Sequence, residues 1–419
     1  MAPCHYSFEN PQLAINGGEK SVKQATPHYT WPHLSNDLLE AITLQAQRSL
    51  SDRDASGVIG EFETAFASFI GRKHAIAFSS GTSALHAMCN AAQLPINAEI
   101  LCCTYGFFAS VSPFSYEGYR LIFCDSDEFG NLSIESLESN FTSNTRAVLA
   151  THVWGNANDM TALVKFCKKR NLILLEDCSH AHFGKWNGKR LGTFGDMAAF
   201  SLNQKALTAG EGGVLVTDTE QYRDLALLFG HYNRRCKIEI ASEHNYKAFA
   251  VTGMGLKHRP HTLSMAIGLN QLGKIHDITA RRQNNLRKLS ASTGDSKLLR
   301  PLLHPFEVAD HGLYQLAFRS PEGIRDQVLA TLIAEGAVEF NKSGSTKLMH
   351  NEPLFRRHRR SRSWTEVDLT PATNERVFPN AKKLHGELIK LPLWGYEGDQ
   401  ETVNQYCAAI EKVLSLIEA

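Results

Sequence analysis

The stretch that decides the fold is Leu172-Ile-Leu-Leu-Glu176-Asp177, a nearly pure aliphatic segment that ends in two acids. An unbroken apolar run of this length predicts a strand buried on both faces, because a half-exposed strand would alternate. An acid at the carboxyl end of such a strand is costly to bury unless it meets a cation or a strong donor. Asp177 is therefore a candidate functional residue, and an Asp that caps the next turn is the alternative.

Short apolar strands and helices alternate on both sides of this segment. Buried strands joined by helices predict an α/β domain whose mostly parallel sheet is covered by helices on both faces. In such sheets ligands bind at the carboxyl ends of the strands. The expected strands are His74–Ser79, Ile100–Cys103, Leu121–Cys124, Ala147–Thr151, Met197–Leu202 and Gly213–Thr217, and the expected helices include Leu38–Ser49, Glu61–Ile70, Thr82–Gln93 and Met160–Lys169.

The pattern changes after residue 260. Pro260 to about Ala291 is typical of one long helix that links two domains, and the strands and helices after it mix as in an α+β domain. We therefore expect an N-terminal arm over 1–30, a large domain over 31–260, a linking helix over 261–293 and a smaller C-terminal domain over 294–419.

Composition excludes several classes of function. The 44 Lys and Arg balance 43 Asp and Glu, so neither nucleic acid nor a membrane surface is the expected partner. No apolar run approaches the roughly 18–20 residues that span a bilayer, and Met1 to Asn10 lack the apolar core of a signal peptide. The nine cysteines form no CxxC pair, and the 18 histidines show no metal-ligand spacing. We expect a cytoplasmic protein with reduced thiols and no metal.

Ser79-Ser80-Gly81-Thr82-Ser83 leads from an expected strand into an expected helix. Free N–H groups and the dipole at a helix N-terminus bind phosphate, and Thr82 and Ser83 add hydroxyl donors. A plain helix cap is the alternative. After another strand, Thr104-Tyr-Gly-Phe107-Phe108-Ala-Ser110 offers an aromatic that can stack on a flat ring, with core packing as the alternative.

Lys205 lies between an apolar strand and the glycine-rich turn Gly210-Glu-Gly-Gly213. A desolvated lysine is a nucleophilic amine, as Schiff-base chemistry requires, whereas a surface lysine in a loop is the alternative. The turn lacks the G-x-G-x-x-G spacing, so no dinucleotide fingerprint is present.

In this order, the phosphate site, aromatic, acid and lysine resemble the DegT/StrS family of pyridoxal-phosphate (PLP)-dependent sugar aminotransferases over nearly the whole chain. The resemblance implies an aspartate-aminotransferase-like α/β fold of type I. The residues that carry it are Leu13-Ala-Ile-Asn-Gly-Gly18, Ser80-Gly-Thr-Ser-Ala-Leu85, Glu176-Asp177, Phe200-Ser201, Lys205 with Gly210-Glu-Gly-Gly213, Ile267-Gly-Leu-Asn-Gln-Leu272 and Leu391-Pro392-Leu393.

The resemblance implies that Lys205 holds PLP as a Schiff base and then moves a proton between cofactor and substrate. It implies that Asp177 pairs with the pyridine nitrogen and keeps it protonated. Phe107 is expected to stack on the ring rather than Phe108, because the family places the stacking residue two positions before an Ala-Ser step. His180 is expected near the ring hydroxyl.

The resemblance also assigns the phosphate contacts, to Thr82, Ser83 and Ser201. Only four steps separate Ser201 from Lys205, one fewer than the family usually has, so Asn203 is the alternative contact. Asn233 matches a residue that the family lends to the phosphate of the neighbouring subunit. The implied assembly is a homodimer with shared active sites.

The expected reaction is ping-pong transamination from glutamate or glutamine to a keto-sugar or keto-cyclitol, in the biosynthesis of an amino sugar or specialised metabolite. Some relatives replace the lysine with histidine and act as sugar dehydratases, so Lys205 favours transamination. Another PLP outcome (dehydration, elimination or decarboxylation) and a non-catalytic ligand-binding role stay open. The basic stretch Arg356–Arg362 is expected to be a solvated loop, with contact to an anionic substrate as the alternative.

Overall fold

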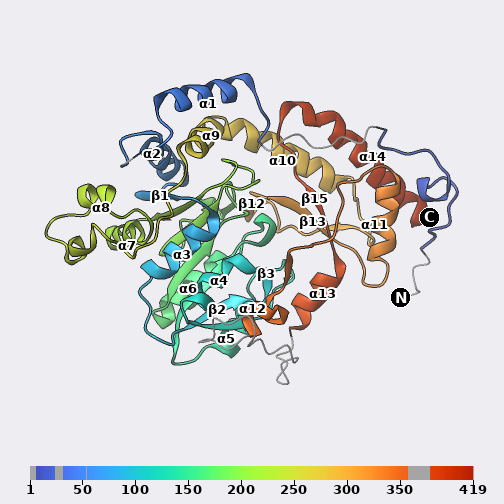
Figure 1. The fold of residues 1–419 in the computed structure, drawn as a ribbon. Helices are drawn as coiled ribbons and strands as arrows, with labels where there is room; N and C mark the ends of the chain where they lie inside the picture. Colours follow the sequence, from blue (N-terminus) through green and yellow to red (C-terminus); the bar gives the residue numbers. More distant parts are fainter. Residues whose placement is uncertain (1–5, 24–31, 53, 357–377, 419) are drawn as a thin grey trace.

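A computed structural model of the chain describes residues 6–23, 32–52, 54–356 and 378–418. Its centre is a seven-stranded sheet in the order β1-β10-β9-β6-β5-β2-β4 (Figure 1). β10 runs antiparallel to β1 and β9, and the other strand pairs of this sheet are parallel, so the predicted mostly parallel α/β fold is confirmed. The strands are β1 His74–Phe78, β2 Glu99–Cys103, β4 Arg120–Cys124, β5 Thr145–Thr151, β6 Ile173–Asp177, β9 Met197–Ser201 and β10 Gly213–Thr217.

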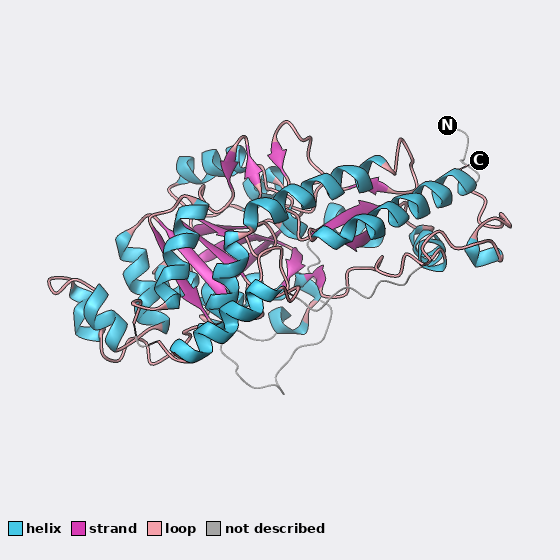
Figure 2. Cartoon of the chain, turned by 90° about the horizontal axis from the view of Figure 1, so that it is seen from above, coloured by secondary structure: helices cyan, strands magenta, loops and turns pink. Residues whose placement is uncertain are grey.

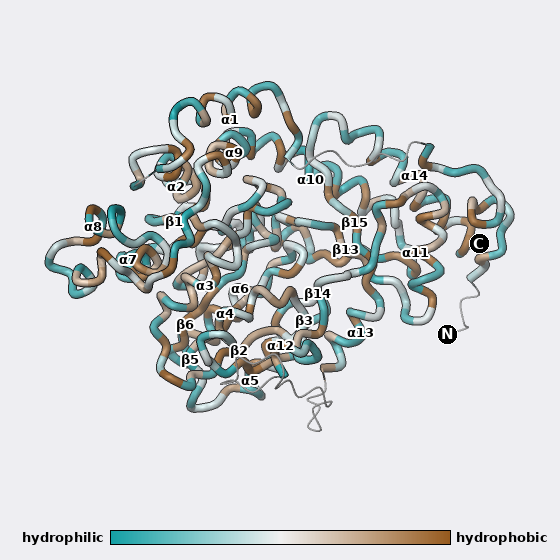
Figure 3. The backbone as a smooth tube through the Cα atoms, in the orientation of Figure 1, coloured by the Kyte–Doolittle hydropathy of each residue, from teal (hydrophilic) through white to brown (hydrophobic). Residues whose placement is uncertain are grey.

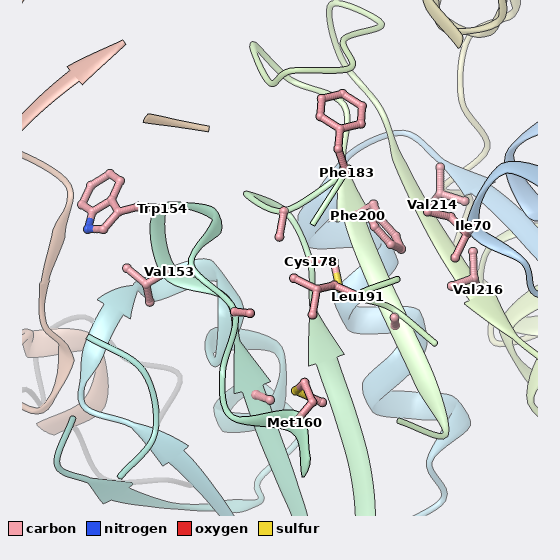
Figure 4. Close-up of a cluster of buried hydrophobic side chains, with 14 of the residues drawn as sticks. Ile70, Val153, Trp154, Met160, Cys178, Phe183, Leu191, Phe200, Val214 and Val216 are labelled. Carbon is pink, nitrogen blue, oxygen red and sulfur yellow. The ribbon is translucent and has the colours of Figure 1, made fainter. Parts of the chain in front are cut away.

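Helices cover both faces of this sheet, and the hydrophobic character of its inner strands fits that position (Figures 2 and 3). Leu174 of β6 packs in one core cluster and its neighbour Leu175 in another, because successive residues of a strand point to opposite faces. Figure 4 shows part of the first cluster, including Phe200, Val214 and Val216. The first cluster involves α2 Val58–Ile70, α5 Ile134–Asn140, α6 Met160–Arg170 and α9 Thr262–Gly273, and the second α3 Gly81–Ala91, α4 Ser112–Tyr116, α7 Glu220–Gly230 and α8 Arg234–Glu239.

A third core belongs to the C-terminal part of the chain. There a three-stranded antiparallel sheet packs with three helices. Residues of the N-terminal arm join this core: Leu13 is fully buried in it, and the Ala14 N–H donates to Glu335 Oε1 at 2.8 Å. The sheet has the order β11 Arg300–Pro301, β13 Gln315–Arg319, β15 Leu388–Pro392, and the helices are α10 Ile275–Ala291, α11 Arg325–Ala334 and α14 Gln400–Ile417.

The predicted single helix over 261–293 is two helices in the structure, α9 and α10, which meet at Lys274. The break coincides with a change of packing partner. α9 packs on α2 and on α1 (Asn36–Arg48), whereas α10 packs on α14 of the small domain. Lys274 forms an ion pair with Asp37 of α1, which holds this junction against the large domain.

Smaller elements complete the chain. The eight cysteines in the described ranges are free. None of the helices described there is long and apolar enough to cross a membrane. The remaining elements are β3 Tyr105–Phe107, paired with β14 Thr346–Leu348, the small sheet β12 Ala309–Asp310, β7 Lys185–Trp186 and β8 Lys189–Arg190, the helices α12 Pro353–Arg356 and α13 Pro379–Glu387, and short 3-10 turns that include η2 Phe108–Ser110 and η3 Val153–Gly155.

Candidate active site

A cavity of about 280 Å³ opens where the carboxyl ends of β5, β6 and β9 meet the N-terminus of α3. The last residue of each strand, Thr151, Asp177 and Ser201, lines it. This is the edge at which parallel sheets bind ligands, because the strand ends and helix N-termini converge there. Its other lining residues are Ser80, Gly81, Thr82, Leu85, Phe107, Ala109, Ser110, Val153, Ser179, His180, Asn203, Lys205, Glu211 and Thr346.

Lys205 supplies the amine of this cavity. Its Nζ lies 4.0 Å from the ring centroid of Tyr314, a cation–π contact with the small domain. Burial lowers the pKa of Lys205 to about 8, although the charges of Asp177 and Glu211 oppose the shift. The positive charge of Lys390 lowers this pKa further. Lys205 is therefore much easier to deprotonate than an exposed lysine, which makes it a better nucleophile.

Asp177 is a buried carboxylate that two neighbours hold in place. The Ser110 hydroxyl donates to Oδ2 at 2.5 Å, and the Ser179 backbone N–H donates to Oδ1 at 3.0 Å. These two donors fix the orientation of the carboxyl group, which lines the cavity. Asp177 thus presents its oxygens in a fixed position to any group that enters the cavity.

The N-terminus of α3 approaches β9 closely because small residues stand at the contact. A Cβ on Gly81 would lie 2.6 Å from Ser201 Cβ, and one on Gly213 would lie 2.3 Å from the Ser80 carbonyl oxygen. Side chains at either position would push helix and strand apart. The helix can therefore aim its free N–H groups and its dipole into the cavity, which suits an anion such as phosphate.

Aromatic rings form the wall around Lys205. Phe107 lines the cavity, whereas Phe108 is 45% exposed. The His180 ring is stacked with Trp154 at 5.8 Å and with Tyr314 at 4.9 Å between centroids. Burial, together with the charge of Lys205, lowers the pKa of His180 well below its usual value, so the ring stays neutral.

The structure brings most of the predicted site residues together. Lys205 and Asp177 line one cavity, and so do Thr82, Phe107, His180, Ser201 and the alternative Asn203.

Two predicted site residues lie outside this cavity. The Ser83 hydroxyl lies 2.9 Å from Ser80 Oγ and 3.4 Å from His258 Nδ1, while Ser80 lines the cavity instead. Asn233 stands before α8, where its N–H donates to the Ala250 carbonyl at 2.7 Å. Their roles at the phosphate stay predictions. Of the basic stretch only Arg356 is described, and the rest lies outside the described residues.

The sequence interpretation gave no role to Ser110, Trp154, Tyr314 and Lys390. Ser110 lies within the aromatic stretch quoted above, where a hydroxyl was a usable signal. Tyr314 contacts Lys205 from the C-terminal part of the chain, and no local pattern tells which residues there approach the lysine. A lone lysine in the apolar run that forms β15 was the one available hint for Lys390.

His152, Glu176 and Cys178 place their ligand atoms within 4.8 Å of one another, behind the cavity. Glu176 already accepts three backbone N–H groups from residues 192–195 at 2.7–2.8 Å, besides its contact with His152. These bonds satisfy the buried carboxylate and fix the loop before β9. We interpret this group as structural.

A mostly parallel α/β sheet with a buried lysine and a buried carboxylate in one cavity at its carboxyl edge is the arrangement of a lysine-dependent class of enzyme. Residues 52–411 match the DegT/DnrJ/EryC1/StrS aminotransferase family, so the chain belongs to that family. It is thus an aminotransferase by class, and the family implies PLP as its cofactor. The predicted family is confirmed.

Relatives by sequence and by structure agree with this membership. The chain is 28% identical over 391 residues to a putative L-glutamine:3-amino-2,3-dideoxy-scyllo-inosose aminotransferase of Micromonospora echinospora, a match that covers 91% of this chain and 88% of the relative. It is 34% identical over 227 residues to a GDP-perosamine synthase of Escherichia coli O157:H7, covering 54% and 60% of the two chains. An aminotransferase from Psychrobacter cryohalolentis shares the fold with a TM-score of 0.81 at 24% identity, covering 94% and 100%.

Proposed function

We propose that this chain binds PLP in the cavity at Lys205 and transfers an amino group from an amino acid to a keto-sugar or keto-cyclitol. The observation that carries the proposal is the buried Lys205 amine, with its pKa lowered to about 8, in one cavity with the pinned carboxylate of Asp177. Substrates of this kind appear in the names of the relatives, one a cyclitol aminotransferase and one a GDP-perosamine synthase.

The residues present fit the cofactor. The N-terminus of α3, with Ser80, Gly81 and Thr82, would hold the phosphate, together with Ser201 or Asn203. Asp177 would hold the ring nitrogen, and Phe107 would cover a ring face. Gly81 matters for this fit, because a side chain there would close the cradle.

When bound, PLP supplies an aldehyde that takes up the amino group and a protonated ring that accepts the electron pair of a breaking C–H bond. Asp177 would hold the ring nitrogen in its protonated form, and its two hydrogen-bond donors fix the orientation of the carboxylate. Lys205 Nζ would hold the cofactor's aldehyde carbon, and the same amine is the group in this cavity that could carry a proton to or from the donor carbon. The ring of Tyr314 covers this amine on one side.

The homodimer with shared sites is part of the proposal. Asn233 begins α8, which projects from the large domain in Figure 1 and lies outside the cavity of its own chain. Exposed apolar side chains gather around it, namely Ile238, Phe249, Val251 and Met254. Apolar side chains in such number on a projecting segment favour burial against a second copy of the chain.

The test combines cofactor binding with a half-reaction. We expect the purified protein to bind PLP with a visible absorption band, and glutamine or glutamate to bleach that band while releasing the matching 2-oxo acid. Borohydride treatment should fix the cofactor on Lys205. Lys205→Ala should abolish both results, whereas Lys185→Ala, which removes an exposed lysine paired with Asp310, should change neither.

Three outcomes would contradict the proposal. A protein that takes up no PLP would rule out the cofactor. Cofactor fixed on another lysine would rule out Lys205. Bleaching without a 2-oxo acid would favour elimination or dehydration over amino transfer.

A further inference from the structure

Thr346 is a buried residue of the cavity wall that comes from a distant part of the chain. Of the described residues that line this cavity, Thr346 alone follows residue 211, and it belongs to β14. It is 2% exposed. Within the ranges that the structure describes, its hydroxyl forms no hydrogen bond with the protein, whereas its carbonyl accepts one from the Ser343 hydroxyl at 2.7 Å. A buried hydroxyl without a partner is costly, and a ligand in the cavity can supply the missing bond.

The backbone fixes Thr346 beside Phe107. β14 pairs antiparallel with β3, and Thr346 lies directly opposite Phe107 in this ladder. Residues in such a pair point to the same face, so the hydroxyl and the phenyl ring are neighbours at the cavity wall. Just after β14, the Met349 N–H donates to the Thr104 carbonyl at 2.7 Å, which ties this segment to the large domain. A hydroxyl on so rigid a base loses little order when a ligand binds.

The polar groups of the large domain already match the charged and reactive groups of the proposed cofactor. The N-terminus of α3 suits the phosphate, Asp177 the ring nitrogen and Lys205 the aldehyde. Thr346 adds no charge, because a threonine hydroxyl is a neutral donor and acceptor. Such a group matches the hydroxyls of a sugar or cyclitol, whereas the carboxylate of an amino-acid donor favours a cation.

We propose that Thr346 hydrogen-bonds a hydroxyl group of the keto-sugar or keto-cyclitol and so selects hydroxylated ring ketones as acceptors. The inference rests on the proposed function. A site built to pair with a substrate hydroxyl rejects an analogue that lacks it, because the polar group of the site is then left unpaired. Amino transfer by a ping-pong route has two half-reactions, and only the one with the ketone should depend on this hydroxyl.

Thr346→Val tests the inference with a side chain of the same shape that lacks the hydroxyl. The enzyme is loaded with pyridoxamine phosphate and mixed with scyllo-inosose or GDP-4-keto-6-deoxymannose, whichever the wild type converts faster. Stopped-flow absorbance follows the return of the PLP band. The variant should lower the second-order rate constant about 10-fold, the effect of one hydrogen bond lost from a buried polar group. Bleaching by the amino-acid donor and the affinity for PLP should stay unchanged.

Three comparisons assign the effect to the hydroxyl. Cyclohexanone has the ketone but no hydroxyl group, so wild type and Thr346→Val should convert it at equal rates. Thr346→Ser keeps a hydroxyl and should recover much of the rate with the hydroxylated ketone. Thr331→Val is the matched control and should change neither half-reaction, because Thr331 is a buried threonine of α11 whose hydroxyl donates to the Gln327 carbonyl within its own helix.

The outcomes separate this inference from the function on which it rests. A wild type that binds no PLP, or that converts neither hydroxylated ketone, contradicts the proposed function. If Thr346→Val instead binds PLP more weakly, the hydroxyl serves the cofactor and the inference is wrong. If the variant slows bleaching by the donor, or the reaction of cyclohexanone, as much as that of the hydroxylated ketone, Thr346 only shapes the cavity and the inference is again wrong. Should Thr346→Val not fold, Thr346→Ala and Thr346→Ser give the same comparison.

Discussion

Asp177 shows how one strand end becomes a functional group. The aliphatic run of β6 buries the residue. The hydroxyl of Ser110 and the backbone N–H of Ser179 each donate to one of its carboxyl oxygens, and neither donor comes from β6 itself. The sequence therefore predicts the acid, while the fold supplies the donors that fix its orientation.

Replacing Asp177 by Asn tests the role of its carboxylate by changing a single atom. The amide keeps the shape and can still accept the Ser179 N–H, but it cannot hold a proton on the ring nitrogen. We expect PLP to bind while the rate of bleaching by the donor falls at least about 100-fold. Ser110→Ala should lower the rate of bleaching less, by roughly 10-fold, because the carboxylate of Asp177 remains. Stopped-flow absorbance measures both, and a D177N rate near that of the wild type would exclude the role of the carboxylate.

The pKa of Lys205 carries a stability consequence. In the cofactor-free protein this pKa is lowered to about 8, whereas an exposed lysine stays protonated to higher pH. Between pH 8 and about 10 the unfolded chain binds a proton that the folded chain lacks, so stability rises with pH in that window. Lys205→Met should therefore stabilise the cofactor-free protein by roughly 2–3 kcal/mol at pH 7, and the gain should fade toward pH 10.

Urea unfolding of both cofactor-free proteins at pH 7 and near pH 10 measures this difference. Lys185→Met is the control, because it removes a lysine that is paired with Asp310 and does not line the cavity. A gain for Lys205→Met that does not change with pH would mean that packing, and not the proton, stabilises the variant.

At the scale of elements, the proposed phosphate site depends on the close contact between the N-terminus of α3 and the end of β9. Gly81→Ala should force them apart, since the new Cβ would overlap Ser201 Cβ. We expect a loss of about 1–3 kcal/mol in stability and a PLP affinity lowered by at least about 10-fold. Gly273→Ala is the matched control, because nothing lies within 4 Å of its Cβ position in α9. Thermal unfolding measures the stability and PLP titration measures the affinity. An unaltered affinity in Gly81→Ala would show that PLP binding does not depend on the contact between α3 and β9.

Sequence patterns predicted these elements well where one periodicity belongs to one packing partner. The central strands follow directly from their aliphatic runs, since burial on both faces leaves no other arrangement. The prediction of one linking helix was wrong, because the helical pattern of the sequence continues while the packing partner changes from α2 to α14. Lys274, tied to Asp37, marks the change, and a tertiary ion pair leaves no trace in a local pattern.

At the scale of the whole molecule, the same limit explains the missed residues. Tyr314 follows a loop that closes on η3, where its N–H donates to the Trp154 carbonyl at 2.9 Å. Gly155 permits this contact, because a Cβ there would meet Leu313 Cα at 2.5 Å. Which residues of the C-terminal part approach Lys205 thus depends on how two domains dock. Docking depends on shape over the whole interface, so the place of Tyr314 could not be read from its own segment.

Shared sites in a homodimer give the last prediction. If Asn233 serves the cavity of the other subunit, a dimer of Lys205→Ala chains and a dimer of Asn233→Gly chains are each inactive at both sites. A hybrid dimer of one chain of each kind contains one intact site, in which Lys205 comes from one chain and Asn233 from the other. Mixing equal amounts after mild dissociation should restore about one quarter of wild-type activity. Glycine is the right substitute, because Asn233 has φ 73° and glycine adopts this conformation without strain. Light scattering should report a dimer throughout, and a mixture that stays inactive although hybrids form would place each site within a single chain.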